Sequence, residues 1–306
     1  RQNLLYMKKN RLSLAFLSLL IAASPLRAQD TLQNETVEQK DKRMEWFSQA
    51  KLGIFIHWGI YSVRGVSESW SFFNNYLPYD EYMEQEKGFT ASKYDPKAWV
   101  DLIKESGAKY TVITTKHHDG VALWDTKVGD ISVVKSTPAK RDLIAPFVKE
   151  VRKQGLKLGF YYSLLDWSHP DYPNKTRTEV RYKNDPERWA RFNKFNFGQL
   201  AELNKTWKPD LYWFDGDWEQ SAEAWNSKGI VDLLRSDNKN VIINLTELHN
   251  ALASSPKFPF YSAAYFKALP FIVELRNKNG KKDEPELETC FEALYGVLLL
   301  RLQKKP

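Results

Sequence analysis

A regular alternation of short apolar runs with longer helix-like segments constrains this chain most. Between residues 52 and 250, five runs of strand length recur, and segments with helical spacing separate them. Parallel strands joined by helical crossovers produce this rhythm, because each crossover must carry the chain back along the sheet. The sequence therefore predicts an α/β fold with a parallel sheet. The expected strands are residues 52–59, 110–114, 156–163, 211–214 and 241–244.

Helix boundary signals lie between these runs. Asp95-Pro96 combines an N-cap residue with proline in the first turn, and Gly107 ends that expected helix. Residues 60–94 form a long aromatic loop, and a loop of that length in a compact domain is usually functional. The other expected helices begin near Met44 or cover residues 143–154, 186–207 and 222–235.

Two parallel-sheet folds fit the alternation. A doubly wound sheet usually carries a G-x-G-x-x-G phosphate turn after its first strand, and this sequence has none. Polar residues instead gather where the strands end, as in a TIM-like (β/α)8 barrel. We therefore predict such a barrel over residues 43–250. After Asn244 too few residues remain for three good repeats, so we expect the barrel to be incomplete and residues 251–306 to form an atypical C-terminal tail.

The composition excludes several classes of protein. The net charge of +7 comes from the two ends of the chain, because residues 29–250 carry 31 basic and 32 acidic side chains. The central body is therefore not a basic nucleic-acid binder. Cys290 is the only cysteine, which excludes an intrachain disulfide and a zinc framework of cysteines.

The first 28 residues combine a short upstream stretch with the pattern of a secretory signal peptide. Basic residues at 8–11 precede an apolar run over residues 12–23, and residues 24–28 supply small side chains. The run is too short to span a bilayer comfortably, although a membrane anchor is the alternative. Residues 29–42 read as a polar leader. We expect an exported protein, periplasmic or secreted, without a stable membrane span after signal removal.

Four expected strand ends deliver groups with useful chemistry. They carry His57, the pair His117-His118, Tyr161 and Asp215. If the barrel forms, these groups meet at one mouth. Imidazoles and a phenol can hydrogen-bond sugar hydroxyls, and a carboxylate can attack or stabilise a positive anomeric carbon. Glycoside hydrolysis needs one anionic and one protonated carboxyl group, and Asp215 would be the anion.

Other roles are open for the same side chains. The histidines and Asp119 could ligate zinc, although adjacent histidines on a strand point to opposite faces and would share one ion only if the strand has ended. The histidines could instead satisfy polar groups in the core, and Asp215 could cap the following helix. A Ser-His-Asp hydrolase is disfavoured, because the sequence lacks a G-x-S-x-G elbow. Our prediction is a sugar site without a metal.

These segments resemble, in the same order, motifs of the retaining α-L-fucosidases of glycoside hydrolase family 29. The resemblance covers about residues 43–244. It implies cleavage of terminal α-L-fucose by double displacement through a fucosyl-enzyme intermediate, without a metal or an organic cofactor. The matching segments are residues 52–59 (LGIFIHWG), 110–120 (YTVITTKHHDG), 137–143 (TPAKRDL), 155–163 (GLKLGFYYS) and 209–218 (PDLYWFDGDW).

The resemblance also implies roles for single residues. Asp215 matches the family's nucleophile, and Trp213, two residues earlier, matches a tryptophan near the sugar. Glu68 matches the acidic residue beside the loop tryptophan, although here one residue separates the two. The remaining matches to substrate-binding positions are His57, Trp70, His117, His118 and Tyr161.

The sequence departs from the family after the fifth strand. Family members usually continue with Asn-Asp-Arg, whereas Asn244 is followed here by Leu245 and Thr246, so that arginine is absent. The acid/base glutamate often precedes a Thr-Cys pair, and Glu288 does so here, which makes it the first candidate; Glu247 is a weaker one. The change suggests a truncated, rearranged or frameshifted reading frame, without the family's usual C-terminal β-sandwich.

The sequence thus predicts a retaining α-L-fucosidase that acts on fucosylated oligosaccharides or glycoconjugates and has no nucleic-acid partner. The alternative is a catalytically inactive fucose-binding remnant. A third possibility is a defective chain that forms no stable fold, because an incomplete barrel leaves strand edges unpaired. The oligomeric state is open.

Overall fold

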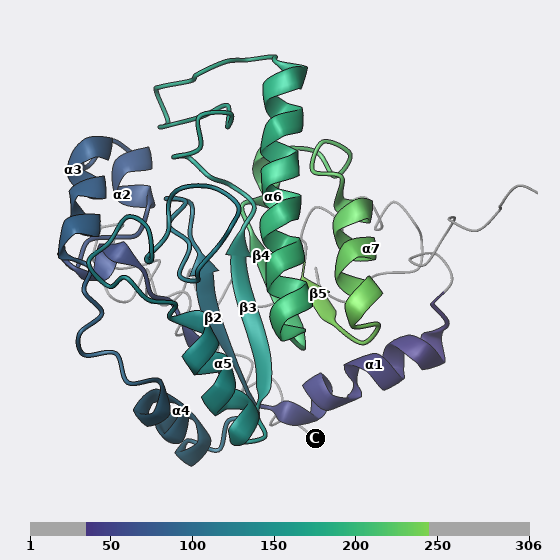
Figure 1. The fold of residues 1–306 in the computed structure, drawn as a ribbon. Helices are drawn as coiled ribbons and strands as arrows, with labels where there is room; N and C mark the ends of the chain where they lie inside the picture. Colours follow the sequence, from purple (N-terminus) through teal and green to yellow (C-terminus); the bar gives the residue numbers. More distant parts are fainter. Residues whose placement is uncertain (1–34, 245–306) are drawn as a thin grey trace, which may run out of the picture. The chain divides into compact units, whose positions relative to one another are not determined.

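Five parallel strands form the centre of the structure, a computed structural model that describes residues 35–244. The expected signal peptide, the C-terminal tail, Glu247 and Glu288 lie outside these residues. The strand order is β1-β2-β3-β4-β5, and each strand pairs in parallel with the next (Figure 1). The strands are β1 (Gly53–Ile56), β2 (Tyr110–Lys116), β3 (Lys157–Ser163), β4 (Leu211–Asp215) and β5 (Ile242–Asn244).

Within residues 35–244, the strand order differs from that of a doubly wound sheet. A doubly wound sheet reverses its order at a switch point, whereas the strands here follow one another without reversal. The predicted α/β parallel sheet is therefore confirmed. The described residues hold five strands, and a (β/α)8 barrel has eight.

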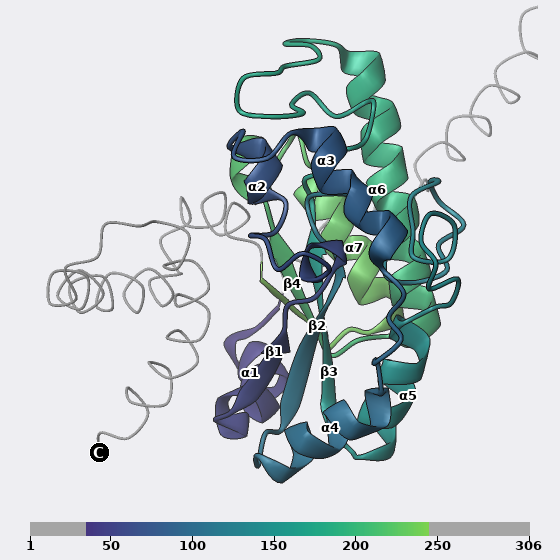
Figure 2. The same ribbon diagram turned by 90° about the vertical axis from the view of Figure 1, so that its left-hand side faces the viewer.

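Helices between the strands cover one face of the sheet (Figure 2). Their starts follow from the sequence, because Asp95 accepts a hydrogen bond from Ala98 N–H and Asp185 accepts one from Arg188 N–H, each with proline next. The described boundaries agree closely with the prediction for three of these helices, and α7 begins five residues later than expected. These helices are α4 (Pro96–Glu105), α5 (Ile144–Lys153), α6 (Pro186–Trp207) and α7 (Ser227–Asp237).

Two expectations about the N-terminal part are corrected. Helix α1 spans Val37–Ala50, so it begins before Met44 and includes the end of the expected leader. Residues 60–94 also contain short helical segments, because rings such as Phe72 and Tyr82, with centroids 4.8 Å apart, bury one side of each turn. These segments are η1 (Ile60–Ser62), α2 (Trp70–Phe73), α3 (Tyr79–Met83) and η2 (Glu84–Gly88).

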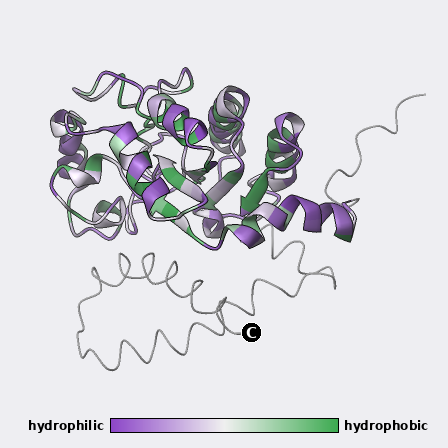
Figure 3. Ribbon diagram, turned by 90° about the horizontal axis from the view of Figure 1, so that it is seen from below, coloured by the Kyte–Doolittle hydropathy of each residue, from purple (hydrophilic) through white to green (hydrophobic). Residues whose placement is uncertain are grey.

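The core follows the sheet. The strands are largely hydrophobic, whereas α1 is mostly hydrophilic (Figure 3). On the sheet face opposite α5–α7, a buried cluster contains Val112, Tyr161, Leu211 and Ile242, and side chains from α1 pack against it. Both ribbon views place α2 and α3 beyond the C-terminal ends of the strands (Figures 1 and 2). Within residues 35–244, no helix has the length and apolar character needed to cross a bilayer.

Candidate active site

The C-terminal ends of β1 to β4 bring the predicted polar residues together. The ring centroid of His117 lies 4.2 Å from that of His118 and 4.9 Å from that of His57. Tyr161 stacks parallel to His117 at 5.6 Å, and His118 Nε2 lies 3.9 Å from Asp215 Oδ2. The predicted convergence of the strand ends is therefore what the structure shows.

Asp215, the last residue of β4, is held at both carboxylate oxygens. The Tyr161 hydroxyl donates to Oδ2 at 2.6 Å, and Gly216 N–H donates to Oδ1 at 2.8 Å. The side chain remains 28% exposed, so it is fixed but reachable. Gly216 has φ +82°, and a Cβ there would meet Leu165 at 2.2 Å, so the turn requires glycine. The alternative that Asp215 caps a helix is wrong, because Gly216 holds the N-cap position of the next helical turn.

Both histidine rings face the site, because β2 ends at Lys116 before the pair begins. The β2–β3 register shifts between Thr114 and Lys116, which breaks the simple alternation of side chains. The rule that adjacent residues of a strand point to opposite faces therefore does not apply to His117 and His118, because the strand has ended before them.

The three imidazoles are neutral at neutral pH. Burial lowers the pKa of His57 and His118 to about 4, although the Asp215 carboxylate opposes the shift in both. Burial also lowers the pKa of His117 well below its usual value, and the neighbouring histidines add to the effect. Neutral imidazoles can both donate and accept hydrogen bonds, which suits the hydroxyl groups of a sugar.

The loop after β1 supplies two further predicted residues. Glu68 Oε1 lies 3.5 Å from His57 Nε2, and Trp70 meets the His118 ring edge-on at 5.6 Å. Trp213 pairs with Tyr161 across β3 and β4, and its ring lies 5.6 Å from that of Phe55, which also contacts His57. All the predicted site residues within residues 35–244 thus belong to one connected group, whereas Glu288 lies outside the described residues.

Aromatic rings continue the site beyond the histidines. Trp167 stacks on Phe73 at 3.9 Å and meets Trp70 edge-on at 5.0 Å. Trp218 is 50% exposed and nearly parallel to Trp70 at 6.3 Å. Exposed ring faces of this kind can cover the apolar face of a sugar.

The sequence did not predict the side chains that hydrogen-bond the histidine rings or those that stabilise the loops after the strands. Ser69 and Ser163 contact the Nδ1 atoms of His117 and His118 at 2.7 and 2.6 Å. Single serines in loops or at strand ends carry no distinctive signal, so only the fold reveals them.

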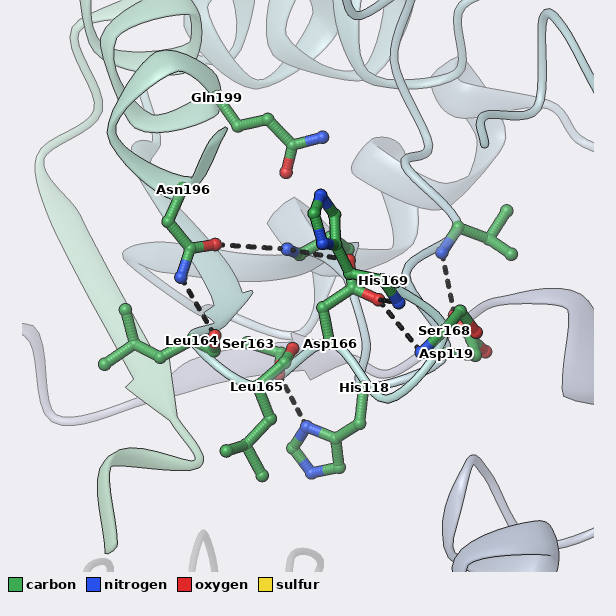
Figure 4. Close-up of polar contacts among 12 residues, drawn as sticks. His118, Asp119, Ser163, Leu164, Leu165, Asp166, Ser168, His169, Asn196 and Gln199 are labelled. Carbon is green, nitrogen blue, oxygen red and sulfur yellow. Dashed lines mark hydrogen bonds and ion pairs between the residues drawn. The ribbon is translucent and has the colours of Figure 1, made fainter. Parts of the chain in front are cut away.

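Lys116 was also missed as a structural group. It is fully buried, with Nζ 3.5 Å from Asp166 Oδ2 and 3.4 Å from Asn196 Oδ1. Burial lowers the pKa of Lys116, while Asp166 opposes that shift. Asp166 also accepts hydrogen bonds from the backbone N–H groups of Ser168 and His169 (Figure 4). The signal that could have revealed this network is a lysine at the end of a strand expected to be buried.

Two groups of side chains are close enough to share a metal ion. They are His57 with Glu68 and His117, and His117 with His118 and Asp215, and in each group the ligand atoms lie within 4.8 Å of one another. A sugar hydroxyl and a cation would use the same ring nitrogens. Treatment with a chelator distinguishes these two occupants.

A parallel α/β sheet whose strand ends bring a fixed carboxylate together with neutral imidazoles is an arrangement that glycoside-cleaving enzymes can use. The family model for α-L-fucosidase matches residues 20–261, and the chain belongs to this family. The resemblance inferred from the five motifs is thereby confirmed, and the match extends past residues 43–244 at both ends. A second model, for a domain of unknown function, matches residues 220–306.

Individual relatives agree with the family. The tissue α-L-fucosidase of Macaca fascicularis is 35% identical over 223 residues, which cover 65% of this chain and 45% of the relative. The human tissue enzyme is 34% identical with the same coverage. Thus the chain spans about half the length of the curated relatives it matches.

Solved structures give the same picture. The α-L-fucosidase isoenzyme 1 from Paenibacillus thiaminolyticus is 36% identical with a TM-score of 0.61, covering 67% of this chain and 50% of that one. A family 29 enzyme from Bacteroides thetaiotaomicron is 34% identical with a TM-score of 0.60, covering 67% and 48%. Here too the similarity covers about half of each longer solved chain.

Proposed function

We propose that this chain is the catalytic domain of a retaining α-L-fucosidase, which hydrolyses terminal α-L-fucosyl groups of oligosaccharides or glycoconjugates. The observation that carries the proposal is the position of Asp215. Asp215 is the last residue of β4, and its carboxylate accepts hydrogen bonds from Tyr161 and Gly216 and lies beside the neutral His118. The chain that presents it belongs to the α-L-fucosidase family.

In the proposed reaction, a carboxylate oxygen of Asp215 attacks the anomeric carbon while the bond to the leaving oxygen breaks. A general acid protonates that oxygen, and water then hydrolyses the fucosyl ester and regenerates the carboxylate. Glu288, and less strongly Glu247, are the proposed acid/base groups. One solved relative, from Bacteroides thetaiotaomicron, is a covalent intermediate trapped with 2-fluoro-fucosyl fluoride, which supports this path.

The neighbouring residues of the site have roles that follow from their contacts. Tyr161 keeps the carboxylate oriented, His57, His117 and His118 hydrogen-bond the sugar hydroxyls, and the rings of Trp70 and Trp213 cover apolar parts of the sugar. The wider proposal is that the five strands belong to a TIM-like barrel and that the protein is exported.

The proposal is tested by hydrolysis of an aryl α-L-fucoside by the purified chain. Asp215→Ala should lower turnover by about three orders of magnitude or more, because it removes the nucleophile. The control is Asp130→Ala, which removes an exposed carboxylate and should leave the rate unchanged. Hydrolysis by Asp215→Ala at the parent's rate would show that the assignment is wrong.

Two further arms of the same assay separate the alternatives. EDTA should leave the rate unchanged, and loss of activity restored by a divalent cation would instead support a metal site. Binding of L-fucose without turnover of either aryl or natural fucosides would identify the chain as an inactive fucose-binding remnant.

A further inference from the structure

Ser163, the last residue of β3, contacts two groups at once in a fully buried position. Its Oγ atom lies 2.7 Å from the carbonyl oxygen of Leu165 and 2.6 Å from Nδ1 of His118 (Figure 4). Both distances are those of hydrogen bonds, so the one hydroxyl group must serve both partners.

The proton of this hydroxyl can serve only one of them. A carbonyl oxygen accepts but cannot donate, so the Ser163 hydroxyl donates its proton to Leu165. Toward His118, the serine oxygen can then only accept, and Nδ1 must carry the hydrogen of the imidazole. The opposite arrangement would leave two oxygen atoms 2.7 Å apart with no proton between them, which is unfavourable in a buried site.

This assignment leaves Nε2 of the neutral ring without a hydrogen. The Nε2 atom is buried and has no hydrogen-bond partner among the described residues. It lies 3.9 Å from Asp215 Oδ2, so two acceptors face the same space. A group that donates hydrogen bonds is needed there, and a sugar hydroxyl is such a group.

We propose that Ser163 is a positioning residue that fixes His118 as the Nδ1–H tautomer, so that Nε2 accepts a hydrogen bond from a hydroxyl of the bound fucosyl group. The part that concerns the sugar rests on the proposed function. An Nε2–H group would instead point its hydrogen at Asp215 and engage the nucleophile. With the other tautomer, the described residues that donate to that carboxylate are Tyr161 and Gly216.

The tautomer can be measured directly by NMR of the full chain with ¹⁵N-labelled histidine, after chelator treatment at neutral pH. Long-range proton–nitrogen correlations show which ring nitrogen carries the hydrogen, and the spectrum of His118→Asn assigns the His118 signals. The parent should show the Nδ1–H pattern. An Nε2–H pattern in the parent overturns the proposal, whether or not any variant folds.

Variants test whether Ser163 sets the tautomer. Ser163→Ala should convert His118 to the Nε2–H form, drawn by the carboxylate, and Ser163→Thr should retain the parent pattern because it keeps a hydroxyl. Ser69→Ala is the matched control, since it removes the serine on His117 and should leave the His118 pattern unchanged. An unchanged Nδ1–H pattern in folded Ser163→Ala contradicts the role of Ser163.

The binding of L-fucose, measured by calorimetry, tests the consequence. Ser163→Ala should weaken binding roughly tenfold, and Ser163→Thr should restore it. Equal affinity of Ser163→Ala and the parent would show that Nε2 does not accept from the sugar. If no version of the chain binds fucose while the NMR result holds, the proposed function fails and the tautomer assignment stands.

Discussion

The Tyr161 hydroxyl donates a hydrogen bond to the carboxylate of Asp215, the proposed nucleophile, at 2.6 Å. Tyr161→Phe should lower kcat/KM for an aryl α-L-fucoside at least about tenfold, because a hydrogen bond to a charged group is lost. The control is Tyr212→Phe, which removes a buried hydroxyl that has no hydrogen-bond partner among the described residues. Equal losses in the two variants would contradict a specific role for Tyr161.

The buried histidines should make the fold sensitive to acid. The pKa of His57 and of His118 is about 4 in the folded chain, against 6.5 for a free histidine. Between these values the unfolded chain binds protons that the folded chain does not, so the free energy of unfolding falls as the pH drops from 6.5 to 4. Each histidine contributes up to about 3 kcal/mol to this loss.

Asp119 works in the opposite direction. Burial raises its pKa to about 7, so the folded chain binds a proton more readily than the unfolded chain between about pH 4 and 7, and this gain grows as the pH falls. Three buried histidines, His57, His117 and His118, act against this one aspartate, so the net effect is a loss of stability as the pH falls. Urea unfolding across this range measures it, and His118→Asn should flatten the curve. A stability that is constant or rises toward about pH 4 would contradict the neutral, buried state of the imidazoles.

At this scale the sequence revealed the reactive groups but not their orientation. His117 and His118 are recognisable because they follow a strand, and Asp215 because it ends one. The shift in register beside Lys116 is invisible in the sequence, since Thr115 and Lys116 would continue a regular strand. The direction of both histidine rings therefore had to come from the fold.

At the scale of elements, the buried pair of Lys116 and Asp166 connects the end of β2 to the loop after β3. Lys116→Met should lower the free energy of unfolding by about 3–5 kcal/mol, because it leaves Asp166 charged and buried without its partner. Adding Asp166→Asn should recover part of this loss, since no uncompensated charge then remains. Urea unfolding curves of the two variants measure both effects.

The control for this pair is an ion pair of the same type on the surface. Lys87 lies 2.6 Å from Glu84, and both side chains are exposed. Lys87→Ala should cost less than about 1 kcal/mol, as exposed pairs do. Similar losses for Lys116→Met and Lys87→Ala would show that burial does not strengthen the inner pair.

Element boundaries could be predicted where local chemistry determines them. Asp185-Pro186 starts α6 by capping, so its bounds agree with the prediction. The turns inside residues 60–94 depend on ring contacts between separate short helices, such as Phe72 of α2 with Tyr79 of α3 at 5.2 Å. Helix α1 begins before the predicted start near Met44, and the sequence misses this because the first turns are polar and show little amphipathic pattern. Its apolar residues Met44, Trp46 and Phe47 pack against the buried cluster on the sheet.

At the scale of the whole molecule, the order of the strands was predictable from the alternation alone. Each strand pairs with its neighbour in sequence, and the helices between them lie on one face. The closure of a barrel was not predictable, because the alternation fades after Asn244. The expected tail and the acid/base candidates fall outside residues 35–244, so they stay predictions.

A packed sheet with a continuous core should unfold as one unit. We expect a single cooperative thermal transition for the purified chain, detected together by far-ultraviolet and near-ultraviolet circular dichroism, because the aromatic rings and the strands share one core. Loss of the aromatic signal well before the strand signal, or a transition without cooperativity, would support the interpretation that the chain is defective.

The central claim is that Asp215 forms a covalent bond with the sugar, and labelling with 2-fluoro-fucosyl fluoride tests it most directly. Fluoride leaves without a general acid, so the label can form even if the acid/base glutamate is missing. Mass spectrometry of the digested protein should find one 2-fluoro-fucosyl adduct on the peptide that contains Asp215, and none on Asp215→Ala. No adduct on the parent, or an adduct on another residue that persists in Asp215→Ala, would contradict the account.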